Sequence, residues 1–325
     1  MTRVVRIHET GGPEVMKLED TELPAPGINE VQLRQRAIGV NYIDIYHRTG
    51  LYKLLNYPVG LGLEAAGIVE QVGEAVKGLK PGDRVAYCGG PVGAYAEYRN
   101  IPARHLVKLP DGVSFELAAA SMVKGITAHY LLTQTFSVHK GDTVLIHAAA
   151  GGVGLIACQM AKHLGAKVIG TVGSAEKAKL AHANGCDFPV LYTHEDLVDK
   201  VREYTEGRGV DVVYDSVGKT TFNNSLDCLK KYGMLVSFGQ SSGAIPPFDI
   251  SVLSQKGSLY LTRPSLIHHI EDEKAYAKST KALFNMMEKN IIHMRIGGMY
   301  HLEEVKQAHI DLESRKTTGA LVLTV

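Results

Sequence analysis

The chain has 325 residues, of which 45% are hydrophobic and 21% charged, a balance typical of a globular protein long enough for two domains. Its 35 Lys and Arg residues against 34 Asp and Glu give a net charge of +1, which argues against nucleic acid or an anionic membrane as a partner. Residues 1–9 carry charge and no apolar segment follows them, so we expect no signal peptide. The four cysteines form no C-x-x-C pair, which favours a reducing, cytoplasmic location.

The N-terminal part of the chain, residues 1 to about 125, consists of short β-rich segments interrupted by Gly and Pro. These segments read "RVVRIHETGG", "EVQLRQRAIGV", "AAGIVEQVG" and "PGDRVAYCGG". Such a pattern predicts a twisted or barrel-like domain of mainly antiparallel strands.

From about residue 140, strands and helices alternate, which is typical of a parallel sheet covered by helices. The segments "DTVLIHA", "KVIGTV", "DFPVLY", "VDVVYDSV", "MLVSFG" and "GSLYLTRP" are predicted as strands. Helices are predicted between them, including one over "FNNSLDCLKKYG" (residues 222–233). Gly165 and Gly185 are placed to end two of these helices, Ser174 to begin one, and Thr193 with Asp196 to form a capping box. The order predicts a doubly wound, dinucleotide-binding type of sheet.

After about residue 266, two helical patterns precede a final strand, "ALVLTV". A strand needs a sheet to join, so we expect the chain to return to its first domain. The predicted division is a β-rich domain over 1–125, an α/β domain over 126–265, and a return to the first domain over 266–325.

The segment "HAAAGGVGL" resembles the dinucleotide fingerprint G-x-G-x-x-G, with Ala149 in place of the first glycine. A small-residue turn between a strand and a helix is the alternative interpretation. The loop follows a predicted strand and opens a predicted helix, where backbone N–H groups and the helix dipole suit a pyrophosphate. Ala149 fits this turn only if its φ is negative.

The end of the next strand indicates which dinucleotide. An NAD site usually has an Asp or Glu there, but "GTVGSAEK" contains no carboxylate before Glu176. Ser174 at the helix N-terminus and Lys177 in its first turn instead suit a 2′-phosphate, which favours NADPH. The alternative is that Ser174 only caps the helix and Lys177 is solvated.

The combined motifs "NYIDIYHRTGLY", "VGEAVKGLKPGDRV", "HAAAGGVG", "VYDSVG" and "GSLYLTRPSL" resemble the medium-chain dehydrogenase/reductase superfamily over the whole chain. The resemblance is greatest to its zinc-independent NADPH:quinone oxidoreductases, the branch that includes zeta-crystallin. It implies an α/β protein in which a doubly wound, parallel Rossmann sheet accompanies a GroES-like, β-rich catalytic domain. It also implies metal-free reduction of quinones by hydride or electron transfer from NADPH.

Zinc members of this superfamily bind their catalytic metal through a Cys in the segment matching Asn41 to Asp44 and a His in a G-H-E motif. Here the second motif reads Gly62-Leu63-Glu64, and the first contains no Cys. A catalytic zinc needs three protein ligands, so we predict no metal.

The resemblance also implies the site residues. Asn41, Tyr46 and Tyr52 are expected near the nicotinamide and the acceptor, although simple packing is an alternative for the tyrosines. Arg315 is expected to reach the cofactor from the tail, or else to be an ordinary residue at a helix end. The whole expected cofactor-binding set is Asn41, Tyr130, Gly151, Gly152, Val153, Gly173, Ser174, Lys177, Tyr192, Ser216, Phe238, Gly239, Ser241, Arg263 and Arg315. Independently of the resemblance, Ser216, Phe238 and Gly239 fall at carboxyl ends of predicted strands, where ligands bind in such sheets.

Quinone reduction has two alternatives. One is reduction of an activated C=C bond in an enone, alkenal or enoyl thioester, and the other is an NADPH-binding structural or RNA-binding protein with weak turnover. The edge segment 257–263 predicts a homodimer, since an exposed strand can pair with its copy across a two-fold axis.

Overall fold

The computed structural model describes all residues, 1–325, and divides into two compact units. Unit 1 consists of Met1–Lys124, Ile270–Phe284 and Met294–Val325, and unit 2 of Gly125–His269 and Asn285–His293. The domain boundaries at 125 and 265 remain predictions. In the structure, Asn285–His293 clusters with unit 2.

Unit 2 is built on a six-stranded sheet in the order β11-β10-β9-β12-β13-β14, with every neighbouring pair parallel. This order is that of a doubly wound dinucleotide-binding sheet, as predicted. The inner strands are rich in buried apolar residues because both of their faces are covered. The strands are β9 (Thr143–Ile146), β10 (Lys167–Val172), β11 (Phe188–Leu191), β12 (Val210–Asp215), β13 (Leu229–Ser237) and β14 (Tyr260–Thr262).

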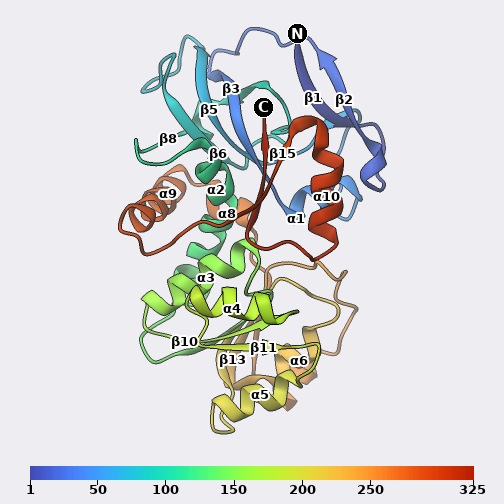
Figure 1. Cartoon of the computed structure of the whole chain (residues 1–325), viewed down its shortest axis with the longest axis vertical. Helices are drawn as coiled ribbons and strands as arrows, with labels where there is room; N and C mark the ends of the chain where they lie inside the picture. Colours follow the sequence, from blue (N-terminus) through green and yellow to red (C-terminus); the bar gives the residue numbers. More distant parts are fainter. The chain divides into compact units, whose positions relative to one another are not determined.

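Helices cover both faces of this sheet: α3 and α4 lie on one side, and α5 and α6 on the other (Figure 1). Gly165 and Gly185 follow α3 and α4 with φ of 86° and 92°, which confirms their predicted role in ending the two helices. The helices of unit 2 are α3 (Gly152–His163), α4 (Ala175–Ala183), α5 (Leu197–Tyr204), α6 (Phe222–Asp227), α7 (Ser251–Gln255) and α8 (Leu266–Ile270).

Two local predictions in unit 2 were wrong. Asp196 alone caps α5, accepting from the backbone N–H of Asp199 at 2.9 Å, so Thr193 does not begin the helix. The helix predicted over 222–233 ends at Asp227, because Leu229 is buried and pairs with Val210 of the sheet. The strand then bulges before its main register begins at Met234.

Unit 1 contains a three-stranded sheet, β2-β1-β4, and a seven-stranded sheet in the order β15-β16-β3-β5-β6-β8, with β7 paired to β3. The predicted final strand is β16, which pairs antiparallel with β3 and parallel with β15. The strands are β1 (Thr2–Ile7), β2 (Met16–Thr21), β3 (Glu30–Val40), β4 (Val59–Gly60), β5 (Glu64–Val72), β6 (Arg84–Cys88), β7 (Tyr98–Pro102), β8 (Val107–Lys108), β15 (Ile296–His301) and β16 (Ala320–Thr324).

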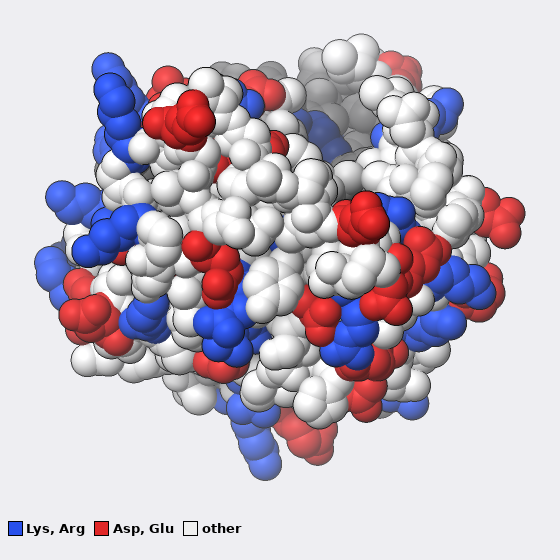
Figure 2. Space-filling model, turned by 90° about the horizontal axis from the view of Figure 1, so that it is seen from above, with Lys and Arg blue, Asp and Glu red and all other residues white.

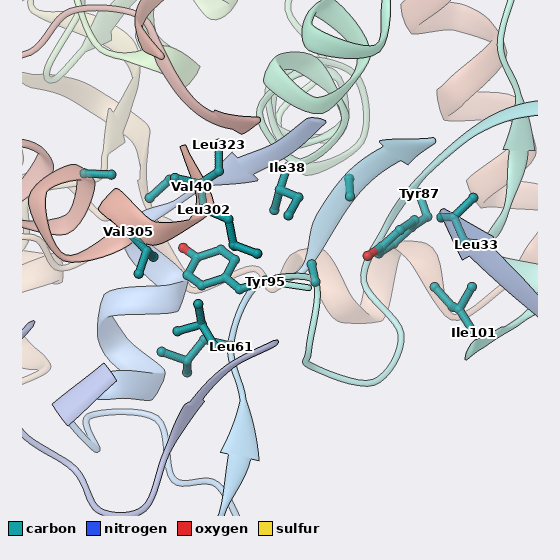
Figure 3. Packing of buried hydrophobic residues seen from close by; sticks show 14 of the residues in the cluster. Leu33, Ile38, Val40, Leu61, Tyr87, Tyr95, Ile101, Leu302, Val305 and Leu323 are labelled. Atoms are coloured by element: carbon teal, nitrogen blue, oxygen red, sulfur yellow. The ribbon is translucent and has the colours of Figure 1, made fainter. Parts of the chain in front are cut away.

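The core of unit 1 is one apolar cluster that joins strand residues to the C-terminal helix α10 (Val305–Glu313). Figure 3 shows the ring of Tyr95 between Leu61 and Leu302, with its hydroxyl group directed toward Val305. Burying each such aliphatic side chain contributes about 1.5–3 kcal/mol. This cluster therefore fixes the position of α10 and of the Tyr95 hydroxyl.

Helix α1 (Tyr42–Arg48) belongs to unit 1 and was not predicted. Helix α9 (Glu273–Glu288) was predicted; its residues up to Phe284 belong to unit 1 and those from Asn285 to unit 2. Helix α2 (Phe115–Tyr130) contains the boundary between the units, at Lys124. None of the helices has both the length and the apolarity that a membrane span requires. On the face seen in Figure 2, basic and acidic side chains are interspersed, without a continuous basic stripe.

Candidate active site

The glycine loop of unit 2 presents the N-terminus of α3 at the carboxyl end of β9. Gly151 is the N-cap, with φ of −80° and ψ of 175°, and no side chain caps the helix. The first N–H groups of α3, from Gly152 and Val153 onward, are therefore available for an anionic ligand. At Gly154, an added Cβ would lie 2.2 Å from the carbonyl oxygen of Ala148. The loop and helix thus pack in the way that a dinucleotide-binding turn needs, and the residues present fit such a cofactor.

Ala149 does not have a positive φ, as the dinucleotide-binding turn requires of an alanine at this position. The left-handed residue of the loop is Ala148, with φ of 52°. A non-glycine residue in this region costs about 1–2 kcal/mol, so other contacts must hold the turn.

A buried chain of hydrogen bonds holds Ala148. Thr171 Oγ1 accepts from the backbone N–H of Ala148 at 3.2 Å and lies 3.1 Å from His147 Nδ1. His147 Nε2 lies 3.0 Å from Ser225 Oγ, which donates to Asp215 at 2.9 Å. Burial lowers the pKa of His147, so its ring is neutral and donates through Nε2 while Nδ1 accepts from Thr171. The chain joins the carboxyl ends of β9, β10 and β12 beneath the loop.

The residues expected to bind a 2′-phosphate lie together at the end of β10. Ser174 caps α4, its hydroxyl accepting from the backbone N–H of Lys177 at 3.3 Å. A Cβ on Gly173 would lie 2.8 Å from the Tyr192 hydroxyl, so that phenol lies against the strand end. Partial burial lowers the pKa of Lys177.

One carboxylate does lie nearby. The pKa of Glu176 is lowered by its own backbone N–H and then by the Ser174 hydroxyl. Glu176 is thus a side chain of the first turn of α4, and it does not occupy the strand end where a ribose-binding acid would stand.

The segments after β12, β13 and β14 bring five more predicted residues together. A Cβ on Gly239 would lie 2.6 Å from the carbonyl oxygen of Ser216, and the backbone N–H of Ser241 donates to that same oxygen at 3.2 Å. Arg263 donates to the carbonyl oxygens of Ser237 and Gly239, at 3.1 and 2.9 Å. Phe238 lies between Ser237 and Gly239 in the chain, and its backbone N–H donates to the carbonyl oxygen of Asp215 at 2.9 Å.

Tyr130 stacks on a residue that the sequence did not indicate. Its ring lies 4.0 Å from that of His269, with an interplanar angle of 9°, and His269 Nδ1 lies 3.0 Å from Gln134 Oε1. Tyr130 is buried and precedes a π-helical turn, Leu131–Thr135, a rare conformation that is frequent at functional sites.

In unit 1, the three expected catalytic residues belong to α1 and the segment after it. Asn41 is the N-cap of α1, and its backbone N–H donates to Asp44 at 2.8 Å. The rings of Tyr46 and Tyr52 meet edge to face, 5.1 Å apart. Arg315 also belongs to unit 1, where its charge opposes the rise in the pKa of Tyr42 that burial causes.

The side chain of Asn41 has two partners outside the helix. Its Nδ2 donates to Glu64 Oε1 at 2.8 Å, and its Oδ1 accepts from Lys124 Nζ at 2.8 Å. Lys124 also donates to Glu64 Oε1 at 2.8 Å, and Glu64 accepts from the backbone N–H of Val123 at 2.6 Å. The motifs at Asn41 and Gly62–Glu64 therefore meet in space, around the buried ammonium group of Lys124, which the sequence did not indicate.

A second buried chain leads from Asp44 to α10. Arg48 forms hydrogen bonds of 2.9 Å to both carboxylate oxygens of Glu313 and lies 3.0 Å from His309 Nδ1. The Tyr95 hydroxyl lies 2.9 Å from His309 Nε2 and 2.9 Å from Asp44 Oδ2. Because Arg48 can only donate, His309 accepts at Nδ1 and donates from Nε2 to Tyr95, which donates to Asp44.

Burial strongly shifts the pKa values of Asp44 and His309. It raises the pKa of Asp44 to about 7, and it lowers the pKa of His309 to about 3, with the Arg48 charge adding to the second effect. Asp44 Oδ1 is buried without a hydrogen-bond partner. A protonated carboxyl suits that environment better than a carboxylate.

Two family models match the chain: "Zinc-binding dehydrogenase" over residues 152–281 and "Alcohol dehydrogenase GroES-like domain" over residues 27–111. A quinone oxidoreductase of Pseudomonas aeruginosa is 48% identical over 99% of both chains. A 2-haloacrylate reductase of a Burkholderia species is 42% identical over 99% of both chains. The crystal structure of Escherichia coli quinone oxidoreductase complexed with NADPH has a TM-score of 0.97 at 46% identity, with 100% of each chain covered. The chain belongs to the quinone oxidoreductase family of the medium-chain dehydrogenase/reductase superfamily.

Proposed function

We propose that the chain is an NADPH:quinone oxidoreductase that reduces a small-molecule quinone. The observation that carries the proposal is the uncapped helix N-terminus at Gly151 together with the acid-free end of β10 at Ser174 and Lys177. Full-length similarity to quinone oxidoreductases, one of them complexed with NADPH, agrees with it.

Bound NADPH supplies the hydride, and a proton from solvent completes the hydroquinone. In unit 2, the N–H groups of Gly152 and Val153 bind the pyrophosphate, and Ser174, Lys177 and Tyr192 the 2′-phosphate. In unit 1, Asn41, Tyr46 and Tyr52 orient the acceptor through their polar groups. Other residues proposed to line the cofactor are Tyr130, Gly173, Ser216, Phe238, Gly239, Ser241, Arg263 and Arg315.

The test is oxidation of NADPH followed with a panel of quinones, enones, 2-haloacrylate and an enoyl thioester, with NADH run in parallel. We expect the highest kcat/KM with quinones. Turnover of the C=C substrates alone would exclude quinone reduction, and NADPH binding without turnover of any acceptor would favour the non-enzymatic alternative.

Reduction of an activated C=C bond is the second candidate, because a relative of 42% identity is named as a 2-haloacrylate reductase. Hydride addition to such a bond also places negative charge on a carbonyl or carboxylate oxygen. The same donors in unit 1 would serve that chemistry.

Lys177→Ala should weaken NADPH binding about 10- to 100-fold and leave NADH binding nearly unchanged, because a charge-assisted contact to the phosphate contributes about 1.5–3 kcal/mol. Fluorescence titration with both dinucleotides measures the effect. Lys179→Ala, two residues farther along α4, is the control and should bind NADPH like the unmodified protein. Equal losses for NADPH and NADH would contradict the assignment of Lys177.

We also propose a cytoplasmic homodimer. All four cysteines are buried and none forms a disulfide, as suits a reducing compartment. Strand β14 lies at the edge of the sheet and exposes Tyr260 by 58%, so segment 257–263 can pair with its copy. Sedimentation at micromolar concentration should give twice the chain mass, and Thr262→Pro should reduce it; a monomer mass for the unmodified protein would contradict the dimer.

A further inference from the structure

The ammonium group of Lys124 is the only positive charge in contact with Asn41, and it is nearly inaccessible. The Lys124 side chain is 7% exposed and that of Glu64 is 0% exposed. Removing two such charges from water is costly, and one ion pair with a few hydrogen bonds often fails to recover that cost. A function for the cation would explain why the protein keeps it where an apolar pair would serve the fold as well.

The hydrogen bonds of this cluster leave one N–H of Lys124 uncommitted. An ammonium group has three N–H donors, and the structure gives Lys124 two acceptors, Asn41 Oδ1 and Glu64 Oε1. Glu64 is itself fixed by Asn41 Nδ2 and by the backbone N–H of Val123. Hydrogen bonds also hold the Glu64 acceptor in place, and the structure gives the third N–H of Lys124 no acceptor within the protein.

Asn41 is also fixed by this arrangement. Its two amide atoms have different partners, since Oδ1 accepts from Lys124 and Nδ2 donates to Glu64. The amide orientation is thereby determined, because a flipped amide would place its NH2 group against the ammonium. A group that binds beside Asn41 meets a positive charge and an N–H donor in a water-poor environment, where such interactions are strongest.

We propose that Lys124 is a catalytic residue, whose third N–H donates to the acceptor oxygen on which negative charge develops during reduction. This inference rests on the proposed quinone reduction. The bond is a hydrogen bond only, and the ammonium keeps its proton. Glu64 is then a positioning residue that holds Lys124 and Asn41.

Lys124→Met removes the charge and keeps the length of the side chain, and we expect kcat with quinones to fall about 100-fold or more, as when an oxyanion donor is removed. The single variant leaves Glu64 as an unpaired buried charge and is expected to lose stability. The double variant Lys124→Met with Glu64→Gln removes both charges, so its unfolding temperature should return toward that of the unmodified protein while kcat stays low. Lys108→Met, at an exposed lysine of the same unit, is the control for both measurements.

A second readout needs neither NADPH nor turnover. 4-Nitrophenol resembles a hydroquinone that loses a proton, and its anion absorbs visible light. Bound beside Lys124 it should ionise at a lower pH than free in solution, and in the double variant this difference should disappear.

Recovery of both stability and kcat in the double variant, or an unchanged nitrophenol titration, would reduce Lys124 to a structural role and overturn the inference. An unmodified protein that reduces no quinone with NADPH would instead refute the proposed function. The nitrophenol titration distinguishes the two failures, because it reports on the Lys124 charge in either case.

Discussion

Gly154→Ala is expected to lower the free energy of unfolding by about 1–3 kcal/mol and to weaken NADPH binding at least about 10-fold. The new Cβ would lie 2.2 Å from the carbonyl oxygen of Ala148 and 2.8 Å from the Cα of Ala149. Both contacts are with backbone, so the loop itself must move. Since Ala148 is already in the left-handed region, the turn has little freedom to relax.

Urea denaturation and fluorescence titration with NADPH measure the two effects of Gly154→Ala. Gly151→Ala is the matched comparison, because its Cβ would lie 3.1 Å from the same carbonyl oxygen and its φ of −80° suits any residue. Gly112→Ala, where nothing lies within 4 Å, is the neutral control. If Gly154→Ala matches Gly112→Ala in both measurements, the turn is not packed as described.

The second large effect concerns pH and Asp44. Its folded pKa of about 7 lies above the value of 3.8 expected in the unfolded chain, so the folded state keeps a proton that the unfolded state has lost. The free energy of unfolding therefore falls as pH rises from about 4 to about 7, by a contribution on the order of 4 kcal/mol, and this effect ends above about pH 7.

His309 acts in the opposite direction. Its folded pKa of about 3 lies below the ordinary 6.5, so below pH 6.5 the unfolded chain gains a proton that the folded protein does not. That contribution to stability rises with pH between about 3 and 6.5. The two groups oppose each other over most of this range, and only above about pH 6.5 does Asp44 act without His309.

Asp44→Asn keeps the shape of the side chain and removes its charge. The difference in free energy of unfolding, variant minus unmodified protein, should therefore increase from pH 5 to pH 8. Tyr95→Phe removes a hydrogen bond that lowers the pKa of Asp44, and it should move the end of the decline to higher pH. Urea denaturation across this range measures both effects. Infrared spectra should show a carboxylic acid band at pH 6 that Asp44→Asn lacks; a band at neither pH 5 nor pH 6, with parallel stability curves, would contradict the raised pKa.

The α/β half of the fold could be predicted because its signals are local. Buried strands, the glycines after helices and the cap at Ser174 each occupy a few consecutive residues. The helix predicted over 222–233 was too long because a tertiary contact decides its end: Leu229 pairs with Val210 and ends the helix that its neighbours favour. Helix α1 was missed because its seven residues lie in a β-rich part of the chain, although Asp44 at the third position after Asn41 is itself a capping signal.

The candidate site divides in the same way. The cofactor residues lie at strand ends, whose common edge follows from a parallel sheet, so the sequence was sufficient to group them. The cluster of Asn41, Glu64 and Lys124 joins three distant segments, and only the fold brings them together. A signal for Lys124 did exist, since it is the one charged residue in the otherwise apolar or small stretch "LAAASMVKGIT".

The place of β16 in its sheet bears on how the chain folds during synthesis. It follows every other element along the chain, yet it lies between β15 and β3 and pairs with both. The seven-stranded sheet can therefore close only after the ribosome has released β16, whereas the six strands of unit 2 are contiguous in the chain and can assemble earlier. Until then the part of β3 from Ala37 to Val40 lacks its β16 partner, and the nascent chain is exposed there to association with other strands.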